Sequence, residues 1–409
     1  AGALGLNVRN GERAGGFFAL GIARETGVPA PVIVTSGTAV ANLLPAALEA
    51  HEGRVPMLLL TADRPAELRG IRSSQTTRQA GILGAFGRWA ADVDVDSALA
   101  AEHSARDRGG APSSLAARAL AAALGRAGGL PPGPVQLNLA FREPLSGLDP
   151  ETRTDWPAGP VTAAGPSGGS LRSDWADDEV YAHDGDALAV VVAGEGAGVE
   201  AEAFAREAGL PLLAEVVSGS RFGREAVTAY ATLLEDPGIG GLIERAIVFG
   251  HPTLTRQVPA LLRRDDVEAI VVDPHIGDGL DGSAPVDHYD PGGRARIVRA
   301  ARVVEGYDPL RMRRWLGAWI VEDRRIREQR STVHEPDLAA ARATGYRERS
   351  AYARAELASL REPVTRELLV ESVWRATWPH DRLVFAASRL GPGPDGPPTP
   401  RPAEGPANP

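Results

Sequence analysis

The sequence predicts an α/β protein with two domains, each built on a parallel β-sheet flanked by helices, and the start of a third domain. Two observations lead to this expectation. Short apolar runs alternate with helical patterns along the chain, and such alternation is typical of parallel sheets covered on both faces. The chain also has 409 residues, more than one ordinary domain of roughly 150 residues needs.

The first alternating series lies within residues 1–150. Phe17, Leu20 and Ile22 fall on or near one face of a helix expected over residues 12–25, ahead of a Gly-Val-Pro stop. β-Branched and leucine-rich runs then indicate buried strands, and alanine-rich runs indicate helices. The elements expected in order are a strand at 32–34, a turn at 36–38, a helix over 39–50, a strand at 57–60, a helix over 115–127 and a strand at 135–139.

A second series follows a stretch rich in Gly, Pro, Ser and Asp at residues 151–186, which we interpret as a linker. A middle α/β domain is expected over 187–308, with strands at 188–192, 246–249 and 269–272 and a helix at 199–208. The remaining predicted segments are a charged helical connection over 309–362, the start of a third domain over 363–390 and a disordered tail rich in proline and glycine over 391–409.

Composition limits the chemistry. The chain contains neither cysteine nor lysine, which excludes disulfides, thiolate chemistry, Schiff-base lysines and the lysine of a Walker phosphate loop. A net charge of −9 argues against nucleic acid as the main partner. No apolar run approaches the roughly 20 residues of a membrane helix, and no export signal is visible, so a cytoplasmic protein without a membrane segment is expected.

Several motifs have an ordinary structural interpretation. Glycines 194, 196 and 198 follow a strand and precede a helix, but Val199 breaks the dinucleotide fingerprint, so a plain strand-to-helix turn is favoured. Asp278, within Gly-Asp-Gly, resembles the start of a thiamine-diphosphate metal motif whose later asparagine is lacking, and a loop aspartate is favoured. The eight histidines form no pair at ligand spacing. No metal-binding residue is therefore predicted in this chain.

Two motifs carry a family resemblance. The stretches TSGTAVANLLP (residues 35–45) and LTADRPAELRG (residues 60–70) follow GERAG (residues 11–15) and precede QTTRQ (residues 75–79). In this order they resemble the 2-succinyl-5-enolpyruvyl-6-hydroxy-3-cyclohexene-1-carboxylate synthase family, thiamine-diphosphate enzymes of menaquinone biosynthesis. The similarity is strong over residues 1–145 and looser to about residue 390, where GHPTLTR (residues 250–256) also fits.

The resemblance implies a thiamine-diphosphate-binding fold and a homodimer or larger oligomer with the cofactor held across the interface. Residues 1–150 would form the pyrimidine-binding domain. Glu12 would be the catalytic residue that touches the aminopyrimidine ring of thiamine diphosphate, since a carboxylate bonded to a ring nitrogen favours the tautomer that can remove the thiazolium proton. Ser36, Gly37 and Thr38 would complete the cofactor contacts, and Mg²⁺ would be the metal.

The implied activity is that of a transferase. It decarboxylates 2-oxoglutarate and adds the four-carbon unit to isochorismate. Both substrates are anionic, which suits Arg64, Gln75 and Arg256 as substrate-binding residues because guanidinium pairs with carboxylate bidentately. Ser388 matches a family serine and is expected to bind substrate too.

Departures from the family pattern bear on activity. Ser74 and Gly11 stand where the family has asparagine and aspartate, a segment before the first helix is missing, and the sequence leaves the pattern from Leu390 onward. We therefore expect a chain truncated at both ends, lacking the diphosphate and magnesium site and inactive alone. Two alternatives remain: an acetolactate-synthase-like decarboxylase, against which the TADRP motif argues, and an inactive remnant that only dimerises.

Overall fold

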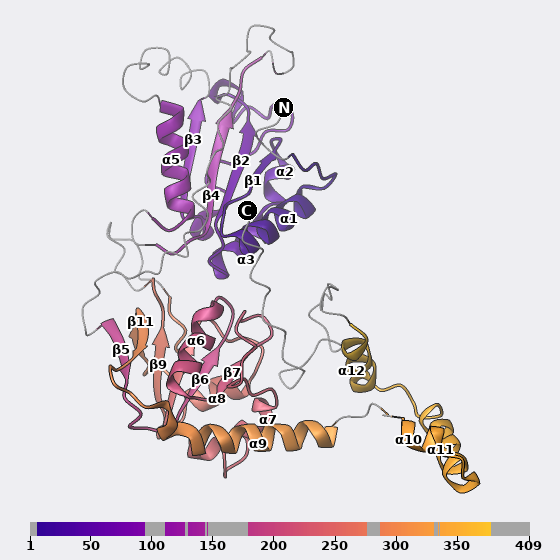
Figure 1. The fold of residues 1–409 in the computed structure, drawn as a ribbon. Helices are drawn as coiled ribbons and strands as arrows, with labels where there is room; N and C mark the ends of the chain where they lie inside the picture. Colours follow the sequence, from indigo (N-terminus) through magenta and orange to yellow (C-terminus); the bar gives the residue numbers. More distant parts are fainter. Residues whose placement is uncertain are drawn as a thin grey trace, which may run out of the picture. The chain divides into compact units, whose positions relative to one another are not determined.

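The computed structural model describes residues 6–94, 111–126, 130–143, 145, 179–275, 287–330, 334 and 336–377. It contains two compact units, one formed by residues 1–175 with 275–287 and the other by residues 176–274 with 288–409. Each unit has a parallel sheet flanked by helices (Figure 1), so the predicted α/β class is confirmed. The domain boundaries expected from the sequence remain predictions.

The first unit is built on a four-stranded sheet in the order β1-β2-β4-β3, with every neighbouring pair parallel. Strand β3 was not among the expected strands, because its sequence WAADVD lacks an apolar run and none of its side chains is fully buried. The elements of this unit are α1 (Glu12–Thr26), β1 (Pro31–Val34), α2 (Thr38–Ala41), α3 (Leu44–Glu52), β2 (Met57–Asp63), the 3₁₀ turns η1 (Ala66–Leu68) and η2 (Gly84–Phe86), β3 (Trp89–Asp94), α5 (Ala111–Ala123) and β4 (Pro134–Ala140).

The two faces of this sheet differ in polarity. Helix α5 covers one face, where Leu58, Val135 and Leu137 pack against its alanines, while α1 and α3 lie on the other (Figure 1). On that second face Met57 and Leu59 are buried among apolar side chains, but Thr61 and Asp63 follow them at the same two-residue period. The face therefore changes from apolar to polar toward the carboxyl ends of the strands.

The single helix predicted over residues 39–50 is wrong in its middle. Helix α2 ends at Ala41 and a separate helix, α3, begins at Leu44, with Pro45 in its first turn. Proline has no N–H and its ring would clash with the carbonyl four residues earlier, so it is tolerated in the first turn but not inside a helix.

The second unit contains a five-stranded parallel sheet in the order β10-β9-β8-β6-β7 and a separate parallel pair, β11-β5. Its strands β6, β8 and β9 match the three expected apolar runs. Its elements are β5 (Val180–His183), β6 (Ala189–Ala193), α6 (Gly198–Ala208), β7 (Leu212–Ala214), α7 (Tyr230–Leu234), η4 (Gly240–Leu242), β8 (Arg245–Phe249), α8 (Gln257–Leu262), β9 (Glu268–Val272), β10 (Arg296–Val298), β11 (Ala300–Val303), η5 (Pro309–Met312), α9 (Arg313–Arg330), α10 (Leu338–Arg342), α11 (Tyr346–Ser359) and α12 (Arg366–Ala376).

Glycine after β6 serves a close approach of two backbones. Glu195 and His251 form an antiparallel bridge between the segments that leave β6 and β8. A Cβ added to Gly194 would lie 2.1 Å from the backbone nitrogen of Pro252, so only glycine fits there. This geometry accounts for a glycine in the strand-to-helix turn without any bound phosphate.

Helix α9 closes the second core with two tryptophans. Trp319 is fully buried, and the Trp315 indole N–H donates a hydrogen bond of 2.7 Å to the carbonyl of Ala189 at the start of β6. No helix in the described part of the chain is both long and apolar enough to cross a membrane.

Candidate functional site at the carboxyl edge of the first sheet

Polar side chains from three adjacent strands meet near the carboxyl ends of the first sheet. Thr61 of β2, Asn138 of β4 and Asp92 of β3 are register partners and so form one row across the sheet. Thr61 and Asn138 are fully buried. Buried polar groups persist only when hydrogen-bonded, and the neighbouring loop that contains Gln79 supplies the partners.

Two buried glutamines and Asn138 form a connected hydrogen-bond network. The Gln79 amide donates to the Asn138 side-chain oxygen at 2.8 Å and to the carbonyl of Ala62 at 2.7 Å. The Gln136 amide donates to Thr61 Oγ1 at 3.1 Å and to the carbonyl of Gln79 at 2.8 Å. Thr61 in turn donates to Asn138 at 3.0 Å. These bonds tie the loop containing Gln79 to β2 and β4.

The network ends in a charged cluster around Asp63. Its carboxylate, 3% exposed as a residue, accepts a hydrogen bond of 2.8 Å from Asn138 and pairs with the Arg69 guanidinium at 3.1 Å. Arg69 also pairs with Asp92 at 2.6 Å. The Asp92 hydrogen bond raises the pKa of Arg69, and the bond from Arg69 lowers the pKa of the Asp92 carboxyl. Both Arg69 and Asp92 therefore carry charge near neutral pH.

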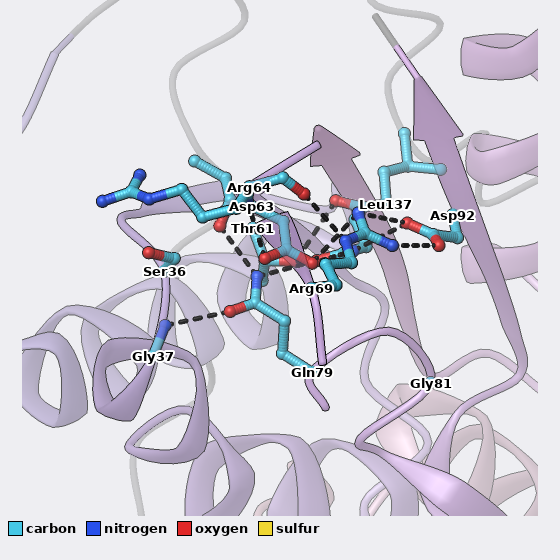
Figure 2. Close-up of polar contacts among 12 residues, drawn as sticks. Ser36, Gly37, Thr61, Asp63, Arg64, Arg69, Gln79, Gly81, Asp92 and Leu137 are labelled. Atoms are coloured by element: carbon cyan, nitrogen blue, oxygen red, sulfur yellow. Dashed lines mark hydrogen bonds and ion pairs between the residues drawn. The ribbon is translucent and has the colours of Figure 1, made fainter. Parts of the chain in front are cut away.

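Arg64 is held through its backbone while its guanidinium stays uncommitted. Its N–H donates to Asp63 Oδ1 at 2.7 Å and its carbonyl accepts from Arg69 Nε at 2.7 Å. Figure 2 shows the Arg64 side chain pointing away from the charged cluster. Within the described residues the guanidinium makes no hydrogen bond or ion pair, whereas Arg69 and Arg142 at the same edge both pair with carboxylates. Arg64 is thus available to an anionic ligand.

The loop between β1 and α2 lies against the segment that contains Gln75. Ser36 Oγ donates to the carbonyl of Gln75 at 2.8 Å, and the Gln75 amide donates to Thr35 Oγ1 at 3.2 Å and to the carbonyl of Ser36 at 3.0 Å. Gly37 has φ 82° and ψ −134°, a conformation available essentially to glycine alone. A Cβ there would lie 3.1 Å from Gln75 Cγ. The structure thus brings Ser36, Gly37 and Gln75 together.

Glu12 and Thr38 have no side-chain partner among the residues that the structure describes. Glu12 is half-buried in the first turn of α1, and Thr38 is exposed at the start of α2. No hydrogen bond or ion pair joins either side chain to another described residue. The expectation that Glu12 lies beside Ser36 to Thr38 and Arg64 is not tested by any contact and stays a prediction.

Arg256 belongs to the second unit. It is exposed at the residue before α8 and, with Thr232 and Glu235, helps line a shallow pocket of about 360 Å³. The preceding backbone is fixed by the buried Glu215 carboxylate, which accepts N–H bonds from residues 253, 254 and 255 at 2.9, 2.8 and 3.0 Å. Ser388 and Asp278 lie outside the described residues.

Sequence reasoning missed the buried network that supports the site. Gln79 was quoted only as part of a motif, and Gln136 and Asn138 were assigned only to a strand. The spacing of Gln136 and Asn138 could have indicated this network. Amide side chains two residues apart in an otherwise apolar strand share one face, and buried amides need hydrogen-bond partners. The parts of the chain that the structure describes contain no group of three or more His, Asp or Glu placed to hold a metal ion.

The chain matches known proteins over nearly all of its length. A family model described as the thiamine pyrophosphate enzyme N-terminal TPP binding domain matches residues 6–82, which include Glu12, the Ser36 loop and Arg64. Three relatives carry the name 2-succinyl-5-enolpyruvyl-6-hydroxy-3-cyclohexene-1-carboxylate synthase. The relative from Leifsonia xyli subsp. xyli is 50% identical over 397 residues, 95% of this chain and 63% of the relative.

The other two relatives show the same pattern. The protein from Clavibacter michiganensis subsp. michiganensis is 47% identical over 94% of this chain and 62% of its own length, and the protein from an Arthrobacter species is 42% identical over 78% and 50%. The chain thus spans about 63% of the length of the Leifsonia relative. Over the part that it spans, the chain is thus similar to the 2-succinyl-5-enolpyruvyl-6-hydroxy-3-cyclohexene-1-carboxylate synthases, and its first 82 residues include a thiamine pyrophosphate enzyme N-terminal domain match.

Proposed function

We propose that this chain supplies the pyrimidine-binding and middle domains of a thiamine-diphosphate-dependent transferase. The proposed reaction decarboxylates 2-oxoglutarate and adds the four-carbon unit to isochorismate, giving the product for which the relatives are named. The observation that carries the proposal is the Arg64 guanidinium, which has no partner among the described residues, at the carboxyl edge where ligands of open α/β sheets bind. The 50% identity to the Leifsonia synthase supports it.

The residues present fit the pyrimidine end of the cofactor. Glu12 is a half-buried carboxylate without a described partner, able to hold a proton at a ring nitrogen. The Thr38 hydroxyl is also uncommitted, and Gly37 offers backbone without a side chain. When bound, thiamine diphosphate supplies a carbon nucleophile that adds to a 2-oxo acid and permits loss of carbon dioxide. Mg²⁺ would accompany its diphosphate, and we assign no residue of this chain to the metal.

The substrate side of the proposal rests on charge. Arg64 can form a bidentate pair with a carboxylate, and the Gln75 side-chain oxygen accepts no hydrogen bond from described residues. Arg256 would contribute a second positive charge, and Ser388 a hydroxyl. We further propose a cytoplasmic homodimer or larger oligomer in which the cofactor is held between subunits.

Decarboxylation is the direct test. Carbon dioxide release from 2-oxoglutarate and from pyruvate is measured with isochorismate, thiamine diphosphate and Mg²⁺, using this chain alone and the chain extended with the segments that the Leifsonia relative has outside the matched region. We expect release from 2-oxoglutarate by the extended protein and none by the chain alone. A preference for pyruvate would favour the acetolactate-synthase-like alternative, and no turnover by either protein would favour the inactive remnant.

Arg64 provides the residue-level test. In the extended protein, Arg64→Met should lower kcat/KM for 2-oxoglutarate by roughly a hundredfold, because an unpaired carboxylate loses a charge-assisted bidentate bond worth about 2–3 kcal/mol. Arg78→Met is the matched control: this exposed arginine lies in the neighbouring segment and has no described partner. Equal effects of the two substitutions would contradict the role of Arg64.

A further inference from the structure

Gln79 makes three side-chain hydrogen bonds to three different segments. Its oxygen accepts from the Gly37 N–H at 2.9 Å, and its nitrogen donates to the carbonyl of Ala62 at 2.7 Å and to Asn138 Oδ1 at 2.8 Å. The side chain is fully buried. Both amide hydrogens are therefore used, and no water is needed to satisfy the group. Figure 2 shows Gln79 between Gly37 and the strand end that carries Asp63 and Arg64.

Gly37 has a particular need for this acceptor. Its backbone lies in a region of φ and ψ that is essentially restricted to glycine, and the short helix that follows it has no side-chain cap. The residue is buried, so its N–H must find a partner inside the protein. Gln79 supplies that partner and helps to hold the loop in this conformation.

A continuous chain of hydrogen bonds leads from Gly37 to Arg64. Gln79 bonds to Asn138, whose amide donates to Asp63 Oδ2 at 2.8 Å, and Asp63 Oδ1 accepts from the Arg64 N–H at 2.7 Å. The bond from Gln79 to the Ala62 carbonyl joins the same strand end directly. We propose that Gln79 is a positioning residue that couples the Ser36–Thr38 loop to the backbone of Arg64, and so sets the cofactor and substrate contacts of one site relative to each other.

The coupling part of this proposal stands on the contacts alone, and its meaning for the site rests on the proposed function. An amide is needed because one planar group must accept from Gly37 and donate to two oxygens. In Gln79→Glu the shape is kept, but an ionised carboxylate would face the Ala62 carbonyl and Asn138 Oδ1 with no hydrogen to donate. Lone pairs facing each other in a buried site cost free energy.

Gln136 offers a matched control. It is also a fully buried amide of the same network; its oxygen accepts from the Gly81 N–H at 3.0 Å and its nitrogen donates to Thr61 and to the Gln79 carbonyl. Gln136→Glu therefore introduces the same charge at the same burial without touching Gly37. Any difference between the two variants reports the specific bonds of Gln79.

Amide hydrogen exchange of the 409-residue chain tests the coupling. In Gln79→Glu at about pH 9, where a carboxyl with a pKa raised by burial is ionised, the carboxylate should move away from the Ala62 and Asn138 oxygens and so from the Gly37 N–H. The Gly37 amide should then exchange at least about tenfold faster than in the wild type, because it loses its buried acceptor, and the Arg64 amide should also exchange faster. As pH falls and the new carboxyl is protonated, the ratio to wild type should return toward one. In Gln136→Glu, the exchange of the Gly37 amide should be accelerated over wild type no more than that of other amides in the first unit. An unchanged Gly37 amide in Gln79→Glu, or equal acceleration in both variants, would overturn the coupling.

Cofactor binding tests the role in the site separately. Thiamine diphosphate with Mg²⁺ is titrated into the extended protein, and Kd should rise about tenfold or more in Gln79→Glu but not in Gln136→Glu. Equal affinities in wild type and Gln79→Glu, despite faster Gly37 exchange, would overturn the positioning role and leave the proposed function standing. If even the wild type does not bind, the proposed function fails, and the coupling is judged by the exchange ratios.

Discussion

Replacing Asp63 by asparagine should destabilise the first unit through a single misplaced amide. The Asp63 carboxylate accepts hydrogen bonds from Arg64 N and Asn138 Nδ2 at 2.7 and 2.8 Å and forms an ion pair with Arg69 Nη2 at 3.1 Å. The single side-chain oxygen of asparagine can take the place of only one of the two carboxylate oxygens, either the one that accepts from Arg64 N–H or the one that contacts Asn138 and Arg69. Its NH₂ group would then face the donors of Asn138 and Arg69, or, when flipped, the backbone N–H of Arg64.

The size of the destabilisation follows from the buried bonds that are lost and from the ion pair that Arg69 keeps. A hydrogen bond to a charged group contributes about 1.5–3 kcal/mol, and breaking a buried ion pair costs about 3–5 kcal/mol. Arg69 keeps its pair with Asp92, which offsets part of the loss. We therefore expect Asp63→Asn to lower the free energy of unfolding of this unit by roughly 2–4 kcal/mol.

Asp94→Asn is the control at the same sheet edge. Its ion pair with Arg142 joins side chains that are 35% and 37% exposed, so the expected loss is only about 0–1 kcal/mol. Because the chain has two units, global unfolding need not be two-state, and the assay should be hydrogen exchange of β4 peptides as a function of urea. A difference of less than about 1 kcal/mol between the two variants would refute the reasoning.

Three further predictions concern the second unit. Glu215→Ala should lower its stability by roughly 2–4 kcal/mol, because three backbone N–H groups lose their acceptor; thermal melting against wild type measures this. Gly194→Ala should prevent correct closure between β6 and β8, because the new Cβ would lie 2.1 Å from a backbone nitrogen; soluble yield and exchange of those strands would show it, and Gly21→Ala, with open space around it, should be harmless. Burial, with help from the nearby Arg245 charge, lowers the pKa of His183. The unfolded chain therefore binds the proton more readily than the folded one. The contribution of neutral His183 to the free energy of unfolding should be fully present above pH about 6.5 and be lost as pH falls through the folded pKa. The free energy of unfolding from urea titrations should therefore fall between pH 8 and pH 5, roughly 1.5 units either side of that value, and His183→Gln should remove this dependence on pH.

Some features of the candidate site could be predicted from residue patterns, and others depend on contacts between distant residues. The motifs around Ser36 and Arg64 were visible in the sequence, and the rule that parallel strands place their carboxyl ends at one edge predicted where they lie. The resemblance named Arg64 as a substrate-binding residue, but no pattern of residues told whether its guanidinium would be free of partners among the described residues. Arg64 and Arg69 are five residues apart, and only the positions of Asp63 and Asp92 show that Arg69 is engaged.

The sequence by itself determined the α/β class, the strands with continuous apolar runs and the motifs of the family, because burial on both faces of a parallel sheet favours nearly continuous apolar runs. The tertiary structure decided the rest. Strand β3 forms because it pairs with β4, although its own composition does not indicate a strand. The expected helix over residues 39–50 is two helices, because Pro45 lies in the first turn of the second. Gln79 has its partners in segments 17 to 59 residues away along the chain. Hydrogen bonds between distant segments depend on where the folded backbone places each donor and acceptor, and a local pattern of residues contains no information about that distance.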